Sequence, residues 1–217
     1  MLRAAREAGV TVCVATPHCT LHHESSIGHF LERREAAYRL LLEHIRVGEA
    51  DAYPEILLGA EVYLDHDISK GEGIERLCIA DTPYLLVEFP GLKRHPLTAE
   101  WLYALTCRGI KPLIAHIDRY IGWRDMVDDF QGIPMTYQIN DTCFLTMSDR
   151  RKLKKIIPQC SGFLVSSDMH NTDSRATEMG KAYRIAKKHW PQAADDWFTA
   201  NAEHLLAEKR MAGTVVG

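Results

Sequence analysis

The 217-residue chain lacks a long hydrophobic run and a strong excess of charge. A membrane-spanning helix needs about 18 consecutive apolar residues, and no window of the sequence approaches that length. The first seven residues contain no apolar segment typical of an export signal. The 26 Lys and Arg and the 29 Asp and Glu residues give a net charge of −3, which favours neither a nucleic-acid nor a membrane partner. We therefore expect a cytoplasmic protein that is not transmembrane and does not bind nucleic acid.

The motifs of several common catalytic classes are also missing. The six cysteines include no Cys-x-x-Cys pair, which argues against a disulfide framework and a zinc ribbon. None of them is followed six residues later by Arg, as a cysteine-dependent phosphatase requires. No Gly-x-x-x-x-Gly-Lys or Gly-x-Gly-x-x-Gly motif occurs, so nucleotide hydrolysis and dinucleotide redox chemistry have no support.

Short apolar runs rich in β-branched residues alternate with segments of helical composition. This alternation, with 46% apolar and 25% charged residues and no linker-like stretch, predicts a single α/β domain over residues 1–217 with a parallel sheet or barrel. The predicted strands are residues 10–15, 56–60, 84–87, 112–115, 137–139 and 162–166. The predicted helices are residues 2–8, 30–47, 98–107, 148–157 and 176–188.

A polar residue ends nearly every predicted strand. Glu61, Glu88, His116, Asn140 and Asp168 are spaced by 27, 28, 24 and 28 residues, about one βα repeat each. The carboxyl ends of parallel strands share one rim, so we expect these side chains to converge there. His18 follows the first run and belongs to the same set.

Imidazoles and carboxylates in such a set are typical ligands of Zn, Mn or Fe. The candidate metal ligands are His18, Glu61, Glu88, His116, Asp168 and His170. Arg119 and Arg175 follow two of the strand ends and would suit a phosphate, which a guanidinium can bind through two donors. Structural alternatives remain for each residue: a turn or packing role for His18, a salt bridge for Glu88, caps for Glu61 and Asp168, and ion pairs for the arginines.

Two features outside this set lead to further expectations. His22 and His23, with His29 nearby, lie in a polar segment and are expected to be solvated, with a peripheral metal role as the alternative. The chain opens with a helix where a βα barrel would open with a strand. An edge between the first and last strands would then need covering by this chain or by a second copy in a homo-oligomer.

Six short motifs occur in a fixed order along the chain. They are Ala-Thr-Pro-His (15–18), Gly-Ala-Glu-Val-Tyr (59–63), Tyr-Leu-Leu-Val-Glu-Phe-Pro (84–90), Pro-Leu-Ile-Ala-His-Ile-Asp-Arg-Tyr (112–120), Gln-Ile-Asn (138–140) and Ser-Asp-Met-His-Asn (167–171). With these motifs the chain resembles the PHP-type bacterial protein-tyrosine phosphatases of capsular and exopolysaccharide biosynthesis.

The resemblance implies a distorted (β/α)7 barrel and a hydrolase that uses two or three divalent cations, Mn2+ in the first place, with Fe, Zn or Mg as alternatives. It implies that the enzyme dephosphorylates the tyrosine-phosphorylated tail of a polysaccharide-export kinase. The six candidate ligands would bind the cations, and His170, Arg119 and Arg175 would act on the phosphate. The family's first strand, with its His-x-His motif, has no counterpart, so we expect an N-terminally truncated barrel. The alternatives are a phosphoesterase for a small metabolite resembling histidinol phosphate, and a catalytically impaired remnant that acts as a binding module.

Overall fold

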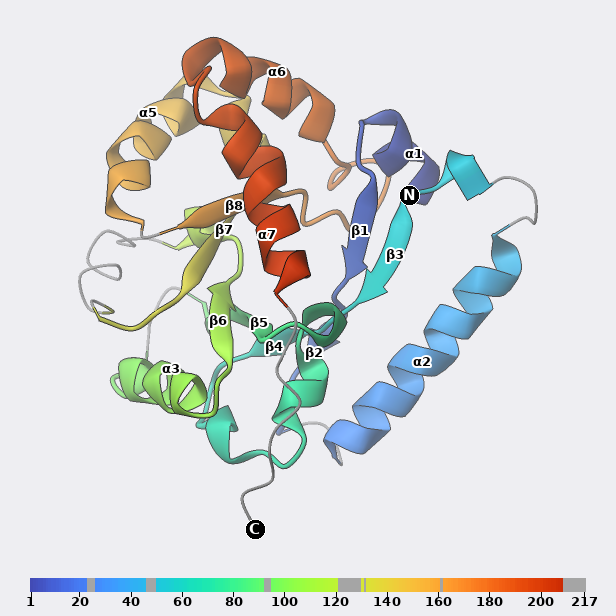
Figure 1. Cartoon of the computed structure of the whole chain (residues 1–217), viewed down its shortest axis with the longest axis vertical. Coiled ribbons are helices and arrows are strands. Elements are labelled where there is room, and N and C mark those ends of the chain that lie inside the picture. The colour runs from blue at the N-terminus through green and yellow to red at the C-terminus, as the bar shows by residue number, and fades with distance from the viewer. Residues whose placement is uncertain are drawn as a thin grey trace.

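Strands and helices alternate along most of the chain (Figure 1). The computed structural model describes residues 1–22, 26–45, 50–91, 95–120, 130, 132–160 and 162–208. In this part the strands are β1 (Val12–Ala15), β2 (His18–Cys19), β3 (Glu55–Leu58), β4 (Glu61–Tyr63), β5 (Tyr84–Glu88), β6 (Lys111–Ile114), β7 (Thr136–Asn140) and β8 (Phe163–Ser166). The α-helices are α1 (Leu2–Glu7), α2 (Ile27–His44), α3 (Thr98–Cys107), α5 (Met147–Ile156), α6 (Met179–His189) and α7 (Asn201–Ala207).

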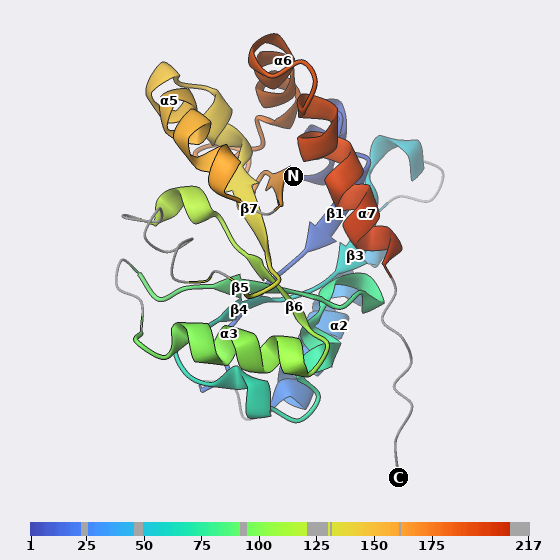
Figure 2. The same ribbon diagram turned by 60° about the vertical axis from the view of Figure 1, so that its left-hand side comes forward.

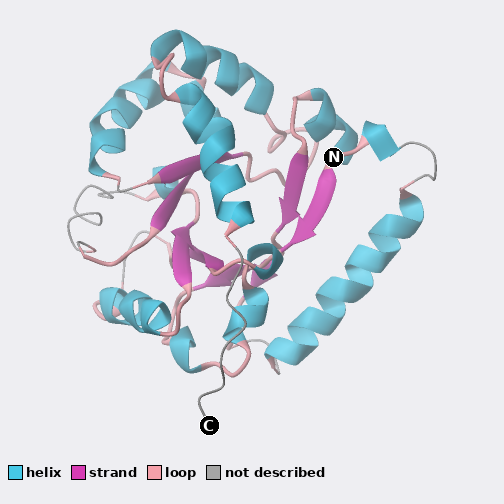
Figure 3. Cartoon of the chain, in the orientation of Figure 1, coloured by secondary structure: helices cyan, strands magenta, loops and turns pink. Residues whose placement is uncertain are grey.

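All strand pairs are parallel, in a six-stranded sheet of order β2-β4-β5-β6-β7-β8 and a two-stranded sheet β1-β3. The helices lie on the outside of the strands (Figure 3). From a second direction, α5 and α6 lie above the strands and α3 lies below them (Figure 2). The predicted α/β class with a parallel sheet is thus confirmed. Closure into a barrel is not confirmed: in the described residues the larger sheet ends at β8 on one side and at β2 on the other, and β1 pairs only with β3.

All six predicted strands are present, and the first two, predicted at residues 10–15 and 56–60, correspond to β1 and β3. Each is followed by a short strand that was not predicted: β2 follows β1 after Thr16 and Pro17, and β4 follows β3 after Gly59 and Ala60. The pairing continues across both breaks: the Gly59 N–H donates to the Ala15 carbonyl at 2.9 Å, and the Glu61 N–H to the Pro17 carbonyl at 3.1 Å. A Cβ at Gly59 would lie 3.1 Å from the side chains of Thr16 and Ile79, so the bend has little room for a larger residue.

The predicted helices match α1, α2, α3, α5 and α6 within a few residues. α2 begins at Ile27 because Ser26 caps it, its Oγ accepting the His29 N–H at 3.1 Å. Residues 46 and 47, predicted as the end of this helix, lie outside the described residues. Thr146 caps α5 in the same way. α7 was not predicted from the sequence.

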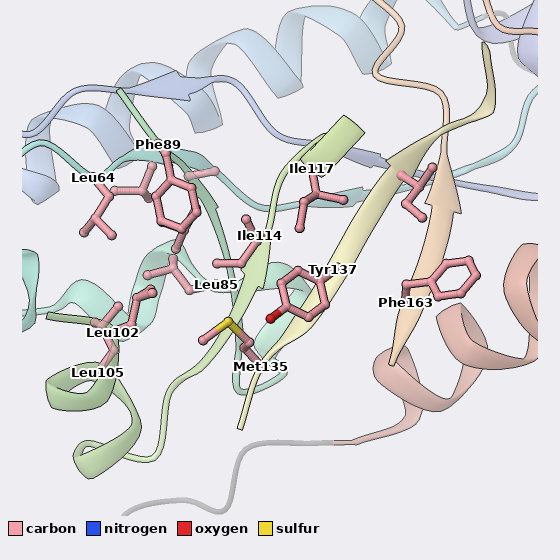
Figure 4. Close-up of a cluster of buried hydrophobic side chains, with 14 of the residues drawn as sticks. Leu64, Leu85, Phe89, Leu102, Leu105, Ile114, Ile117, Met135, Tyr137 and Phe163 are labelled. Carbon is pink, nitrogen blue, oxygen red and sulfur yellow. The ribbon is translucent and has the colours of Figure 1, made fainter. Parts of the chain in front are cut away.

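The main apolar core lies between the strands and the helices that cover them (Figure 4). Leu102 and Leu105 of α3 are fully buried, as are Leu85 of β5 and Ile114 of β6. Burial of such side chains contributes about 1.5–3 kcal/mol each. Figure 4 also labels Leu64, Phe89, Ile117, Met135, Tyr137 and Phe163 of this core.

The sequence predicts that the edge between the first and last strands is covered, either by this chain or by a second copy. In the structure, elements of this chain cover the space between β8 and β1. A second apolar cluster includes Leu164 of β8, Leu205 of α7 and, at its margin, Val14 of β1. At the other end, Gly180 of α6 lies so close to α1 that a Cβ there would come within 2.8 Å of the Ala8 carbonyl oxygen. None of the described helices combines the length and the apolar character that crossing a membrane requires.

Candidate functional site

The polar residues predicted at the strand ends occupy one rim of the parallel strands. His18 and Glu61 lie just beyond the carboxyl ends of β1 and β3, at the first positions of the short strands β2 and β4, where they are register partners; Glu88 closes β5. His116 lies two residues beyond β6, and Asp168 and His170 follow β8. Because all these strands are parallel, their carboxyl ends bring residues that are far apart in sequence within reach of one another.

Two carboxylates lie between two imidazoles at the centre of this rim. The Glu61 carboxylate places one oxygen 2.9 Å from His116 Nε2 and the other 3.3 Å from His18 Nδ1. The Glu88 carboxylate repeats the arrangement, with its oxygens 3.4 Å from His116 Nε2 and 3.7 Å from His18 Nδ1. Each carboxylate therefore bridges the same two imidazoles.

Burial differs across this group. The side chains of Glu61 and His116 are 5% and 4% exposed, whereas that of His18 is 58% exposed. Burial disfavours the charged imidazole of His116, but the hydrogen bonds that it donates to Glu61 and Glu88 outweigh this effect and raise the pKa of His116 to about 9. The hydrogen bond from His116 lowers the pKa of Glu88 against the opposing effect of burial. The site is therefore buried at Glu61 and His116 and open to solvent at His18.

His170 joins this centre from the β8 side. Its Nδ1 lies 2.9 Å from the main-chain oxygen of Asp168, and its Nε2 lies 3.4 Å from Nε2 of His18. A carbonyl oxygen only accepts hydrogen bonds, so Nδ1 carries the proton. In the neutral imidazole, Nε2 of His170 then presents its lone pair toward the centre, as a metal-binding imidazole does.

Asp168 connects the centre to the two predicted arginines. Its Oδ2 accepts hydrogen bonds from Nη2 of Arg175, at 2.6 Å, and from Nη2 of Arg119. Its side chain is 10% exposed, while those of Arg119 and Arg175 are 42% and 35% exposed. The structural alternative considered for the arginines, ion pairing with a rim carboxylate, is thus realised here. It leaves both guanidinium groups side by side at the mouth of the site.

Two of the predicted ligands have a left-handed backbone conformation, which is rare for residues with a Cβ. His116 has φ of 30° and Asp168 has φ of 48°; in the described residues only Ala80 and Asp81 share this feature among non-glycine residues. Such conformations cost about 1–3 kcal/mol and concentrate at functional sites. The main-chain N–H of His116 is held by the side-chain oxygen of Gln138.

A network of buried polar side chains that was not predicted from the sequence lies next to the site. Gln138 Nε2 donates to Asn140 Oδ1 at 3.0 Å, and the Asn140 N–H donates to Asp118 Oδ1 at 2.9 Å. The Tyr120 hydroxyl accepts the N–H of Phe89 at 3.0 Å, and burial raises the pKa of Tyr120. Asn140 was noted as a strand-end residue, but it binds Asp118 rather than the imidazole and carboxylate cluster. The available signal was the spacing of Gln138 and Asn140, two residues apart on one face of a buried strand.

A further buried carboxylate, Asp141, anchors the segment that carries His170 and Arg175. Its Oδ2 accepts the Glu178 N–H at 2.7 Å and the Thr177 hydroxyl at 3.2 Å. Burial, only partly offset by these hydrogen bonds, raises the pKa of Asp141 from 3.8 to about 6.

Replacing Asp141 with asparagine is expected to alter how stability depends on pH. The folded protein holds this proton more tightly than the unfolded chain, so the wild type loses stability as pH rises from about 4 to about 6. The loss totals about 3 kcal/mol, of which about 2 kcal/mol develops between pH 4.5 and pH 7. Urea unfolding of wild type and Asp141→Asn at these two pH values should show this difference. Asp173→Asn, an exposed change in the same segment, should match the wild type; equal pH profiles for all three proteins would contradict the expectation.

The donor set of the central cluster fits divalent cations. One ligand atom each from His18, Glu61 and Glu88 lies within 4.8 Å of the others, and His116 contacts both carboxylates. Imidazole nitrogen and carboxylate oxygen together suit Mn, Fe and Zn. Two carboxylates this close, one of them buried, repel each other unless positive charge compensates them.

Comparison with known proteins supplies the family. The model of the family described as capsular polysaccharide synthesis, CpsB/CapC, matches residues 1–207. Tyrosine-protein phosphatase CpsB of Streptococcus pneumoniae is 26% identical over 227 residues, covering 96% of this chain and 89% of its own length. Tyrosine-protein phosphatase YwqE of Bacillus subtilis strain 168 is 27% identical over 220 residues, covering 95% and 82%.

A solved structure shows the same fold. It comes from work on YwqE of Bacillus subtilis and CpsB of Streptococcus pneumoniae, described there as unique metal-dependent tyrosine phosphatases. It superposes with a TM-score of 0.77 at 24% identity and covers 96% of this chain and 85% of the other. The resemblance predicted from the ordered motifs is confirmed: the chain belongs to the CpsB/CapC family of capsular polysaccharide synthesis proteins.

Proposed function

We propose that this chain is a metal-dependent phosphatase that hydrolyses phosphotyrosine on a protein of capsular polysaccharide synthesis. The enzyme class predicted from the sequence is confirmed by the family and by relatives that are named tyrosine-protein phosphatases. One observation supports the proposal of metal-dependent chemistry most directly. Glu61 and Glu88 each bridge His18 and His116, in a site that also contains two arginines.

The proposed cation ligands are the six residues predicted from the sequence: His18, Glu61, Glu88, His116, Asp168 and His170. Mn2+ is the first candidate, and Fe, Zn and Mg are the alternatives. When bound, two or three such cations would lower the pKa of a water molecule and compensate the charge of a phosphoryl group. The two bridging carboxylates and the hydrogen bond from His170 Nδ1 to the main-chain oxygen of Asp168 support this assignment.

The two arginines would bind the phosphoryl oxygens. Asp168 accepts hydrogen bonds from Nη2 of both guanidinium groups. Its negative charge offsets the electrostatic repulsion between Arg119 and Arg175 and keeps them together. Each guanidinium carries five N–H donors in a planar fork that matches phosphate geometry. Donors held in place before the substrate arrives stabilise the transition state without having to reorganise.

Tyrosine phosphate suits a site of this kind. Phenol has a reference pKa of about 10, well below that of an aliphatic alcohol, so its oxygen leaves with less help from a proton donor. His170 is half-exposed and contacts Asp168, which also binds the two phosphate-binding arginines. From this position His170 would help to orient the substrate.

Finer features of the family are proposals for this chain as well. We propose that the strands form the distorted (β/α)7 barrel of PHP phosphatases, which the parallel strand order and the apolar contacts of α7 between β8 and β1 support. We place the enzyme in the cytoplasm, with the phosphorylated tail of a polysaccharide-export kinase as partner. Formation of a homo-oligomer is a further proposal.

Activity toward a panel of phosphomonoesters tests this function. We expect metal-loaded protein to hydrolyse a phosphotyrosine peptide faster than a phosphoserine peptide of the same sequence or histidinol phosphate. Activity should vanish on removal of metal with a chelator and return with Mn2+. Preference for histidinol phosphate would favour the small-metabolite alternative. Absence of hydrolysis with every divalent cation, together with binding of the phosphopeptide, would favour the binding module.

A further inference from the structure

A second group of metal-binding side chains lies outside the proposed catalytic cluster. His22 Nδ1 is 2.7 Å from one oxygen of Asp65, and His66 Nδ1 is 2.6 Å from the other. One ligand atom from each of the three residues lies within 4.8 Å of the others. His22 is exposed, as expected from the sequence, and the fold also brings it to a carboxylate from a distant segment. His23 lies outside the described residues.

Both sides of this cluster are fixed by buried neighbours. Leu64 and Ile68, which flank Asp65 and His66, are 0% and 1% exposed. The Leu64 N–H donates to the Glu88 carbonyl at 2.8 Å, so the backbone next to Asp65 is tied to β5. On the other side, Cys19 is fully buried and Leu21 packs against the core just before His22. The three ligands therefore need little ordering on binding.

The side chains are nevertheless open to solvent. His22, Asp65 and His66 are 45%, 22% and 43% exposed, so a hydrated ion can reach all three. A tetrahedral cation with ligands at about 2.1 Å requires ligand atoms about 3.4 Å apart. The two Nδ1 atoms lie 2.7 Å and 2.6 Å from the Asp65 oxygens, so rotation of the two half-exposed imidazoles would widen these distances to the required spacing.

The cluster lies beside the proposed catalytic centre but shares no ligand with it. His22 follows His18 by four residues, and Asp65 follows Glu61 by four residues, along the neighbouring strands β2 and β4. Four residues of chain span at most about 14 Å. A cation held here would thus add positive charge near His18 and Glu61 of the proposed catalytic centre.

We propose that His22, Asp65 and His66 form a peripheral binding site for a divalent cation of the Zn2+ type. Two imidazoles and one carboxylate are a donor set that suits Zn2+ and its substitute Co2+ better than Mg2+ or Ca2+, which prefer oxygen ligands only. The remaining coordination positions face solvent, where a water or an oxygen of a phosphorylated substrate can complete the shell.

Zinc uptake by the metal-stripped 217-residue chain tests the proposal without any phosphatase assay. We expect calorimetric titration with Zn2+ to show one class of sites in wild type that is absent from the His22→Ala/His66→Ala double variant. Asp65→Asn should weaken this class at least about tenfold, since even indirect contacts to a metal ligand contribute that much. His189→Ala removes an exposed histidine elsewhere and should bind as wild type does.

Nuclear magnetic resonance of the imidazole nitrogens gives an independent reading in wild-type protein, which avoids any folding defect of the variants. Zn2+ should shift the ring nitrogens of His22 and His66 in the wild type and in Glu61→Gln, where the central cluster is altered. Unshifted resonances of these two rings would overturn the proposal. Zn2+ uptake by the double variant equal to that of the wild type would also overturn it. Neither result depends on whether the protein is a tyrosine phosphatase.

Discussion

Replacing Glu61 with glutamine is expected to reduce phosphatase activity by at least about a hundredfold and to lower the metal content of the purified protein. Glutamine keeps the volume of the side chain but removes the charge that faces both His18 and His116. Even residues that only support a metal ligand contribute about 10-fold to 100-fold to affinity or activity, and Glu61 is placed as a ligand itself. Steady-state hydrolysis of a phosphotyrosine peptide and elemental analysis of bound metal measure the two effects.

The matched control is Glu203→Gln, which removes one carboxylate from the exposed surface of α7. It should retain wild-type activity and metal content. Circular dichroism should show that Glu61→Gln remains folded, because the substitution leaves no cavity. A folded Glu61→Gln protein with activity within about threefold of wild type would contradict the proposed role of this carboxylate.

Replacing Arg175 with alanine is expected to cost about 2–4 kcal/mol of transition-state stabilisation, a decrease in kcat/KM of about 30-fold to 1,000-fold. The reason is the loss of one of two guanidinium groups fixed by Asp168 at the mouth of the site. Kinetics with an aryl phosphate and inhibition by inorganic phosphate measure the effect. Arg175→Lys should recover only part of the activity, because an ammonium group cannot bind phosphate through a planar fork.

Arg175 also binds Asp168, so a purely structural role must be distinguished from phosphate binding. A structural role predicts altered metal content with unchanged affinity for inorganic phosphate. Phosphate binding predicts the reverse, together with partial rescue by added guanidinium. Arg184→Ala, on the exposed side of α6, serves as the control. Hydrolysis at the wild-type rate by Arg175→Ala would refute the phosphate-binding role.

The strand positions and the rim residues could be predicted because both follow from local patterns. An apolar run that ends in one polar residue specifies a buried strand and its carboxyl end, and parallel pairing then places successive ends side by side. The short strands β2 and β4 were missed because they are only two and three residues long. The bends at Pro17 and Gly59 that precede them become evident only from the pairing.

Side-chain partners were less predictable. The sequence left Arg119 and Arg175 between phosphate binding and ion pairing, and the structure pairs both with Asp168. Gln138 was singled out only as part of the Gln-Ile-Asn motif and given no role, yet its side chain accepts the N–H of His116, whose φ is positive. Such contacts depend on the direction of each side chain across neighbouring strands, which sequence spacing does not specify.

The amino-acid sequence by itself determined which residues stand at the strand ends, because strand length and hydrophobicity are encoded locally and the repeat of about 27 residues returns the chain to the same rim. Only the tertiary structure decided that Glu61 and Glu88 each bridge His18 and His116, and that His22 meets Asp65 and His66 beside them. The physical reason is that carboxylates and imidazoles interact over a few ångströms, a distance set by the twist, bends and register of the strands together.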